Sequence, residues 1–279
     1  MTLREALKTG ERRLHEAGIA EYRHDAMALL SFTIEKEAAE VFLSGGLLSD
    51  AEAAAYEALI GRRAGRYPLQ YLTGEAYFMG LTFTVNESVL IPRFDTETVC
   101  EQALSGLKPG ARVLDIGTGS GALAVAIKAR RADCTVAATD LSRAALALAR
   151  RNAERNRAEV LFYEGDLFAG APGRYDLIVS NPPYIPRADM ALLQPEVAYE
   201  PTLALDGGED GLDLYRRIIR EAPDHLLEGG RLVLEIGDGE RDALVALTAE
   251  RFQAVSVADD LDGMARALVA SRPKGAHDV

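Results

Sequence analysis

Apolar residues recur at helical spacing along the first quarter of the chain. The repeats include Leu3, Leu7 and Leu14 and, further on, Ala26 and Leu29, and this spacing predicts amphipathic helices. The segment S-D-A-E at 49–52 has the form of a capping box, so we expect a helix from there to about residue 64. No strand pattern interrupts this region. We therefore predict a small helical bundle that forms its own domain.

The period of the pattern changes between Arg66 and Pro92. Pro68 disfavours helix, and the segment from Tyr77 to Leu90 alternates around Gly80 and is rich in β-branched and aromatic residues. This predicts a β-hairpin that links the helical bundle to the rest of the chain. The next helix is expected to begin near residue 96 and to end before residue 109.

Strand and helix patterns alternate after residue 109, which is typical of a doubly wound, mostly parallel α/β sheet. The expected strands are Arg112–Ile116, Thr135–Thr139, Glu159–Tyr163, Tyr175–Ser180, Arg231–Ile236, Val255–Ala258 and Ala265–Ala270. The expected helices are Ala122–Arg130, Arg143–Asn156, Leu212–Leu226 and Glu240–Arg251. The link at 259–263 is too short for a parallel crossover, so we expect the last strand to run antiparallel. The sequence thus predicts a seven-stranded Rossmann-like sheet and three parts, 1–66, 67–95 and 96–279.

The composition narrows the classes of function. Apolar residues make up 48% of the 279 residues, enough for a sizeable core. The formal net charge of −12 argues against a protein that mainly holds a nucleic-acid backbone. We find no signal peptide and no apolar stretch long enough to span a bilayer, and we expect a cytoplasmic protein without membrane contact. Cys100 and Cys134 lack metal-site spacing, so we expect neither a disulfide framework nor a metal.

The stretch Y-D-L-I-V-S-N-P-P-Y-I-P at 175–186 ends an apolar strand at Asn181. The two prolines that follow cannot donate to a sheet, so the chain must leave the sheet there. This places a carboxamide at the strand's carboxyl edge, where open α/β sheets bind ligands. The Asn181 side chain and the Pro182 carbonyl can accept two hydrogen bonds from a planar NH2 group, and Tyr184 offers a ring face. We expect Pro183 to complete this substrate site, which would act by positioning; a simple strand-ending turn is the alternative.

A glycine-rich loop follows the first strand of the sheet. Its glycines permit a tight turn and a close approach of ligand to backbone. The preceding Asp115 disfavours a pyrophosphate and favours a cationic or neutral ligand, and the spacing G-x-G-x-G differs from the dinucleotide pattern. The expected cofactor-binding residues of this segment are Asp115, Gly117, Thr118, Gly119, Ser120 and Gly121.

Two further acidic residues follow the next two strands. Asp140 comes about 20 residues after the loop, where a carboxylate can accept both hydroxyls of a ribose. Asp166, in E-G-D-L-F, could reach an adenine amino group. Each aspartate alone could be a helix cap or a turn residue. Acidic groups at three successive strand ends suit S-adenosylmethionine, whose amine and sulfonium are positive, and NAD is the minor alternative.

With these motifs in place, the chain resembles the peptide chain release factor N5-glutamine methyltransferases, the HemK family of class I methyltransferases. The resemblance covers nearly the whole chain and includes P-L-Q-Y-L-T-G-E at 68–75, V-L-I-P-R at 89–93 and A-L-D-G-G-E-D-G-L-D-L-Y-R-R-I-I at 204–219. It implies methyl transfer from S-adenosyl-L-methionine, leaving S-adenosyl-L-homocysteine, to the glutamine of a Gly-Gly-Gln tripeptide in a release factor. The partner would be the release factor, gripped by the helical N-terminal domain, and we expect a monomer.

The family resemblance also implies roles for individual residues. Asn181 and the Pro182 carbonyl would accept hydrogen bonds from the glutamine NH2, and Tyr184 would pack on its plane. The glycine loop would hold the methionine part, Asp140 the ribose, and Asp166 with Leu167 the adenine. The expected reaction is in-line displacement at the sulfonium methyl, and no general base is assigned.

Three segments depart from the usual family pattern. The chain has I-P-R-F-D-T-E at 91–97 where I-P-R-P-E-T-E is usual, Leu167 where many members have Trp, and D-L-D-G-M-A-R at 260–266 in place of D-L-A-G-R-D-R. None of these changes removes a side chain that the methyl transfer requires. Alternative functions are a ribosomal-protein glutamine methyltransferase and, third, a nucleic-acid methyltransferase that acts on a flipped base. A non-enzymatic scaffold would be expected to have lost Asn181 or the glycine loop.

Overall fold

The computed structural model describes residues 1–43 and 46–274. Residues 44–45 and 275–279, which belong to the first and last predicted parts, lie outside the described residues. The chain divides into two compact units. The first comprises Met1–Glu75 with Gln194–Tyr199, and the second comprises Ala76–Leu193 with Glu200–Val279. The three-part division drawn from the sequence stays a prediction.

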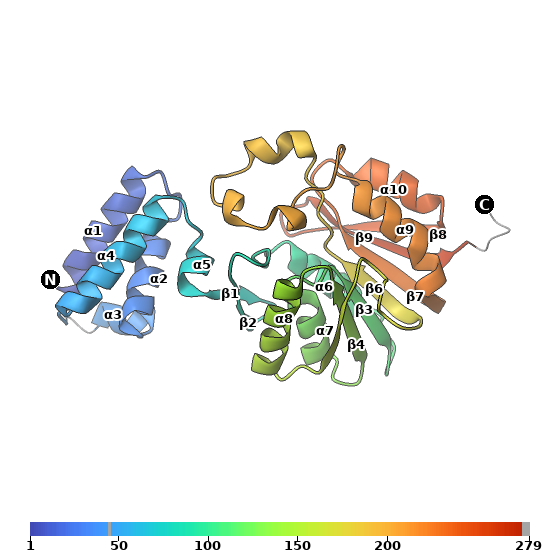
Figure 1. Cartoon of the computed structure of the whole chain (residues 1–279), viewed down its shortest axis with the longest axis horizontal. Coiled ribbons are helices and arrows are strands. Elements are labelled where there is room, and N and C mark those ends of the chain that lie inside the picture. Colours follow the sequence, from blue (N-terminus) through green and yellow to red (C-terminus); the bar gives the residue numbers. More distant parts are fainter. Residues whose placement is uncertain (44–45, 275–279) are drawn as a thin grey trace. The chain divides into compact units, whose positions relative to one another are not determined.

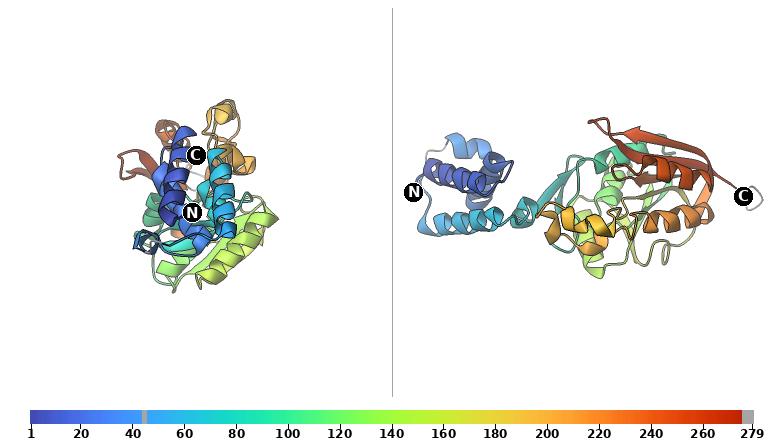
Figure 2. Two further views of the ribbon diagram at one scale, coloured as in Figure 1. Left: turned by 90° about the vertical axis from the view of Figure 1, so that its left-hand side faces the viewer. Right: turned by 90° about the horizontal axis from the view of Figure 1, so that it is seen from above.

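The first unit is helical (Figure 2). Its helices are α1 (Leu3–Glu16), α2 (Tyr22–Ile34), α3 (Ala38–Leu43), α4 (Asp50–Ala64) and α5 (Leu69–Thr73). The predicted capping box is confirmed, since the Glu52 amide donates to Ser49 Oγ at 3.2 Å and the Ser49 amide donates to Glu52 Oε2 at 2.7 Å. Helices α1, α2 and α4 contact one another around a core that includes Leu14, Leu29 and Ile60.

A short segment from late in the chain, Gln194–Tyr199, belongs to this first unit. Glu196 accepts hydrogen bonds from Arg63 Nη1 at 3.1 Å and pairs with Arg66 Nη2 at 3.0 Å. The Tyr199 hydroxyl donates to the Gly65 carbonyl at 3.3 Å. Arg63 is buried and also donates to Asp25 at 2.7 Å. Because Arg63 and Glu196 are both largely shielded from solvent, removing either partner would leave an uncompensated charge inside the unit.

The predicted hairpin is present but shorter than the alternation suggested. Its strands are β1 (Glu75–Phe78) and β2 (Leu81–Thr84), paired around Gly80. Asn86 ends the second strand, because its side chain accepts from the Ser88 amide at 2.9 Å and its carbonyl accepts from the Val89 amide at 3.1 Å. Asn favours such local turns over strand. The alternation up to residue 90 therefore belongs partly to a loop.

The predicted seven-stranded sheet is confirmed (Figure 1). Its strands are β3 (Arg112–Ile116), β4 (Thr135–Asp140), β5 (Val160–Glu164), β6 (Tyr175–Ser180), β7 (Leu226–Glu235), β8 (Phe252–Asp259) and β9 (Ala265–Pro273). They lie in the order β5-β4-β3-β6-β7-β9-β8, and β9 runs antiparallel to β7 and β8. The neighbouring strands from β5 through β4, β3 and β6 to β7 all pair in parallel.

Helices cover both faces of this sheet (Figure 1). One face packs on α6 (Thr96–Leu104), α7 (Ala122–Arg130) and α8 (Arg143–Arg155), and the other packs on α9 (Asp213–His225) and α10 (Arg241–Ala249). Successive residues of a strand feed opposite faces, so Val113 belongs to the first core and Leu114 to the second. Both are fully buried, which explains the continuous apolar runs.

Three short 3-10 turns, Arg187–Leu192, Val197–Tyr199 and Thr202–Ala204, occupy the connection between β6 and α9. In the described ranges, no helix combines the length and the apolar character that crossing a membrane would require.

Candidate functional site

The strand register brings the chemically distinctive residues into one row. Ile116 of β3 pairs with Thr139 of β4 on one side and with Ser180 of β6 on the other. The next residues along the chain, Asp140, Gly117 and Asn181, are therefore aligned side by side at the carboxyl edge of the sheet. Neighbouring strands are about 4.8 Å apart, so Asp140 and Asn181 flank the glycine loop within roughly 10 Å of each other along the edge.

The glycine loop has the backbone that the sequence predicted. Gly117, Gly119 and Gly121 have φ values of 70°, 55° and 84°, a region that residues with a Cβ rarely adopt. The Gly117 and Thr118 amides donate to the Thr139 carbonyl at 2.9 and 3.0 Å, and the Gly119 amide donates to Asp140 Oδ2 at 2.8 Å. The loop is thus anchored to the end of β4 before α7 begins.

Asp115 lies beneath this loop and is only 1% exposed. Its Oδ2 accepts from the Thr118 hydroxyl at 2.6 Å and from the Ala124 amide at 3.2 Å, while its Oδ1 is buried without a hydrogen-bond partner. Burial raises the pKa of Asp115 to about 7, against the opposing effect of these hydrogen bonds. A buried carboxyl oxygen without a donor suits a ligand that brings a donor of its own, such as an ammonium group.

Two more predicted cofactor residues reach the same pocket. Asp140 Oδ1 accepts from the Ser142 amide at 2.8 Å, so this carboxylate braces the loop after β4 as well as the glycine loop. Asp166 is half exposed and forms an ion pair with Arg217 Nη2 at 2.8 Å. Leu167 beside it is buried with φ of 53°, an uncommon conformation for a residue with a side chain.

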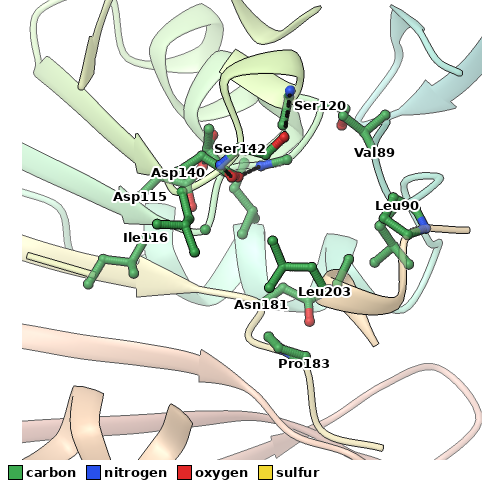
Figure 3. A pocket seen from close by; sticks show the side chains of 18 of the residues that line it. Val89, Leu90, Asp115, Ile116, Ser120, Asp140, Ser142, Asn181, Pro183 and Leu203 are labelled. Atoms are coloured by element: carbon green, nitrogen blue, oxygen red, sulfur yellow. Dashed lines mark hydrogen bonds between the residues drawn. The ribbon is translucent and has the colours of Figure 1, made fainter. Parts of the chain in front are cut away.

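Asn181 stands at the opposite side of the glycine loop from Asp140 (Figure 3). Its Nδ2 donates to Thr96 Oγ1 at 3.3 Å, and its Oδ1 has no partner among the described residues. The hydroxyl of the preceding Ser180 donates to the Ile116 carbonyl at 2.7 Å, which ties the ends of β6 and β3 together. The carboxamide is therefore held with an acceptor available beside the loop.

One pocket of about 340 Å³ unites most of the predicted site (Figure 3). The predicted residues that line it are Asp115, Gly117, Thr118, Gly119, Ser120, Asp140, Asp166, Leu167, Asn181 and Pro183. Gly121, Pro182 and Tyr184 are absent from its lining. The Tyr184 ring packs instead on the second core and beside Gly237, and burial raises the pKa of its hydroxyl. The roles assigned to these residues from the sequence stay predictions.

One wall of the pocket is formed by residues outside the predicted site. Val89, Leu90 and Arg93 line it, and the sequence indicates this V-L-I-P-R block only through the family resemblance. Buried Glu200 holds this wall, because it accepts from the Ile91 amide at 3.0 Å and forms an ion pair with Arg93. Ser142, Leu203 and Arg217 are also in the lining. None of these lining residues belongs to the glycine loop or to the Asn-Pro-Pro turn that ends β6, so no local motif in the sequence pointed to them.

The donor set fits a nucleoside cofactor with a positive group. Three carboxylates and a glycine loop surround a pocket whose remaining walls are largely apolar, and the unpartnered Asp115 oxygen calls for a hydrogen-bond donor. Across the described parts of the chain, we find no cluster of three or more His, Cys, Asp or Glu placed to hold a metal ion.

The mostly parallel sheet with β9 reversed, together with the glycine loop and acidic groups at its edge, defines the class I methyltransferase fold. A family model described as "Methyltransferase small domain" matches residues 95–194, and one described as "PrmC N-terminal domain" matches residues 5–74. A Deinococcus radiodurans protein named release factor glutamine methyltransferase is 43% identical over 99% of this chain and 100% of its own length. One of the same name from Geobacter sulfurreducens is 45% identical over 88% of each chain. The chain belongs to the release factor glutamine methyltransferase family.

Solved structures agree with the fold. A methyltransferase from Pyrococcus furiosus aligns with a TM-score of 0.52 and 25% identity over 69% of this chain and 89% of that one. A T. thermophilus 16S rRNA N2 G1207 methyltransferase, solved with AdoMet and guanosine, aligns with a TM-score of 0.54 and 21% identity over 71% of this chain and 49% of that one. At that identity the second likeness concerns the fold alone.

Proposed function

We propose that this protein transfers a methyl group from S-adenosyl-L-methionine to the side-chain amide nitrogen of the glutamine in the Gly-Gly-Gln motif of a peptide chain release factor. The observation that carries the proposal is the shared pocket of Asn181 and the glycine loop, which follow from adjacent parallel strands in register. We propose further that the enzyme acts as a cytoplasmic monomer on protein and makes no contact with nucleic acid.

The cofactor side of the pocket is built from the glycine loop and three carboxylates. When bound, S-adenosylmethionine supplies an electrophilic methyl group on a sulfonium. Asp115 would accept from the cofactor's ammonium through its unpartnered Oδ1. Asp140 would accept from the ribose hydroxyls with the lone pairs that Gly119 and Ser142 leave free. Asp166 and Leu167 would receive the adenine at the pocket's far wall.

The substrate side rests on Asn181. Because its Nδ2 is committed to Thr96, its Oδ1 is the atom offered to an incoming NH2 group. The Pro182 carbonyl would take the second hydrogen, and Pro183 and Tyr184 would bound the amide plane. An amide nitrogen is a weak nucleophile because its lone pair is delocalised into the carbonyl. Two acceptors on its hydrogens favour the pyramidal geometry from which that lone pair can attack, so the chain's contribution is orientation and electrostatics. The proton can leave after transfer, and we assign no general base.

A methyl-transfer assay tests this function. The protein is incubated with tritiated S-adenosylmethionine and a purified release factor, and in parallel with the same factor carrying Ala in place of the motif's glutamine. Tritium should be incorporated only into the release factor that keeps the glutamine. Equal labelling of both factors, or labelling of added ribosomal protein or rRNA in preference to the factor, would refute the proposed substrate.

A further inference from the structure

A fully buried asparagine of α8 is hydrogen-bonded to the glycine loop. The Oδ1 atom of Asn152 accepts from the Thr84 amide at 2.7 Å, and its Nδ2 donates to the Thr84 carbonyl at 2.9 Å and to the Ser120 carbonyl at 2.8 Å. Because the Thr84 amide can only donate, the carboxamide oxygen must face it, and both Nδ2 hydrogens then face carbonyls. The side chain of Asn152 is therefore held in one orientation between β2 and the glycine loop.

Helix α8 lies directly against the last glycine of this loop. A Cβ atom at Gly121 would be 3.2 Å from the Ala149 Cβ and 3.4 Å from the Ala149 Cα. Ala149 precedes Asn152 by three residues, so both lie on the same face of the helix. Gly121 is absent from the pocket lining, and its lack of a side chain instead allows α8 to approach the loop. This approach brings the Asn152 side chain within reach of Ser120.

The bond from Asn152 fixes the direction of the Ser120 carbonyl just before α7 begins. Among the described residues, no backbone amide donates to this carbonyl, and the first regular hydrogen bond of the helix is accepted by the next carbonyl, that of Gly121. The amide of Ala124 in the first turn is one of the donors that a helix leaves unpaired. It donates instead to Asp115 Oδ2 at 3.2 Å.

Asp115 depends on this amide for its orientation. Its Oδ2 is held by the Thr118 hydroxyl at 2.6 Å and by the Ala124 amide. A carboxylate is planar and rigid, so fixing Oδ2 also fixes Oδ1, the unpartnered oxygen to which the proposed function assigns the cofactor's ammonium. Asp115 and Ser120 both line the pocket (Figure 3). The direction of the Ser120 carbonyl and the aim of the Asp115 carboxylate are therefore linked through the first turn of α7.

We propose that Asn152 is a positioning residue of the cofactor site, which holds the Ser120 carbonyl away from α7 and so keeps the Ala124 amide on Asp115. The inference rests on the proposed function for the identity of the cofactor. Without the Asn152 donor, Ser120 would have a buried carbonyl in need of a partner. Gly121 can adopt a helical conformation at no steric cost from a side chain. The Ala124 amide would then bond the carbonyl four residues earlier, as in a longer α-helix, and Asp115 would lose a donor.

Asn156, one turn further along α8, provides a matched control. It donates to the Thr82 carbonyl of β2 at 2.9 Å and to the backbone carbonyl of Asn152 at 2.9 Å. It thus holds the same hairpin strand as Asn152 does, and in the described part of the chain no hydrogen bond joins it to the glycine loop. The substitution Asn156→Ala therefore weakens the contact between α8 and the hairpin and leaves Ser120 held.

Calorimetry with two nucleosides separates this role from a general loosening of the loop. One ligand is S-adenosyl-L-homocysteine, and the other is its deaminated analogue, which keeps the carboxylate and lacks the ammonium. Asn152→Leu should bind S-adenosyl-L-homocysteine about tenfold more weakly than the wild type, because the carboxylate that pairs with the ammonium is no longer held. Its affinity for the analogue should change less than about twofold. Asn156→Ala should bind both ligands as the wild type does. Equal losses for the two ligands in Asn152→Leu would overturn the proposal.

A double-mutant cycle tests whether Asn152 acts through Asp115. In the Asp115→Asn background, adding Asn152→Leu should weaken binding of S-adenosyl-L-homocysteine by less than about a further twofold. Losses that multiply would show that the two residues act independently and would overturn the proposal. Leucine fills nearly the volume of asparagine, and thermal unfolding first checks that the variant is folded. If it is not, Asn152→Ser replaces it in both experiments.

The wild type also puts the inference at risk, because equal affinity for the two ligands would overturn it without any variant. The binding experiments use no release factor, so they are independent of the proposed substrate. A protein that shows the expected ligand pattern and leaves the release-factor glutamine unmethylated would refute that substrate and support the role of Asn152. A protein that methylates the glutamine while Asn152→Leu discriminates between the ligands as the wild type does would refute the role of Asn152 alone.

Discussion

Replacing Asp115 with Asn should abolish the pH dependence of cofactor affinity. Asp115 is buried under the glycine loop with its Oδ1 unpartnered, and burial raises its pKa to about 7. Below that pH the wild-type carboxyl group is neutral, and above it the carboxylate can pair with the cofactor's ammonium. An Asn side chain has nearly the same size but no charge at any pH, so it isolates the electrostatic contribution.

The size of the effect follows from the ionised fraction. If only the carboxylate pairs with the ammonium, the association constant scales with that fraction. Between about pH 7.5 and about pH 5.5 the fraction falls roughly 25-fold for a pKa of about 7, which corresponds to about 1.9 kcal/mol of binding free energy. The α-amino group of the ligand stays mostly protonated over this range. Ionisation of Asp115, and not of the ligand, should therefore account for most of the pH dependence of cofactor affinity.

Isothermal titration calorimetry across this pH range measures the affinity directly. We expect the wild-type dissociation constant to increase as pH falls and the Asp115→Asn constant to stay nearly level. Buffers of different ionisation enthalpy should show proton release on binding near pH 6.5 in the wild type only. If the dissociation constant depends on pH equally in the wild type and in Asp115→Asn, the ammonium does not pair with Asp115.

The stability of the protein without ligand should show the opposite trend. The pKa of Asp115 is raised from 3.8 to about 7, so between these values the folded state binds more protons than the unfolded state. Stability therefore falls as pH rises across this window, by an amount on the order of 4 kcal/mol at most. Chemical unfolding of Asp115→Asn should lack this part of the decline. An equal decline in both proteins would mean that Asp115 is not the group that titrates.

Three other substitutions test the site and its frame. Asn181→Ala should lower kcat about 100-fold while cofactor affinity stays at the wild-type value, and unchanged turnover would remove Asn181 from its role. Asp140→Ala should weaken cofactor binding roughly 10- to 100-fold, because it loses the ribose contacts and the bracing of Gly119 and Ser142; wild-type affinity by calorimetry would count against it. Gly165→Ala should lower the unfolding free energy by about 1–3 kcal/mol or more, since its Cβ would lie 1.8 Å from the Ala169 carbonyl oxygen. Gly61→Ala, where the nearest atom would be 3.7 Å away, is the matched control and should not destabilise.

The elements that the sequence located best are those with uninterrupted burial. Strands β3 and β6 and helix α7 have the bounds that the sequence pattern predicted, because most residues of each are buried and apolar, and a glycine, an Asn-Pro-Pro turn or charged residues mark where each ends. Strand β7 was predicted to begin at residue 231 and begins at Leu226. Exposed Glu228 and two glycines occupy its first half, and its pairing with β6 shifts register there, so the local pattern resembles a loop.

The residues of the site also differ in whether the sequence alone could locate them. The glycine loop, Asp140 and Asn181 could be found because each follows a strand and carries a local signal. Thr96 could not, because its hydrogen bond with Asn181 depends on the packing of α6 against the sheet. The attachment of Gln194–Tyr199 to the helical unit likewise rests on ion pairs between residues far apart in the chain. Such pairs leave no periodic pattern in the sequence.

The most direct test of the central claim is fragment-level mass spectrometry of a release factor after incubation with this protein and S-adenosylmethionine, in the presence of ribosomes as competing substrate. The account predicts one added methyl group, located by fragment ions on the side chain of the Gly-Gly-Gln glutamine and absent when Asn181→Ala replaces the wild type. A methyl group found at another residue of the factor, or only on ribosomal protein or rRNA, would contradict it.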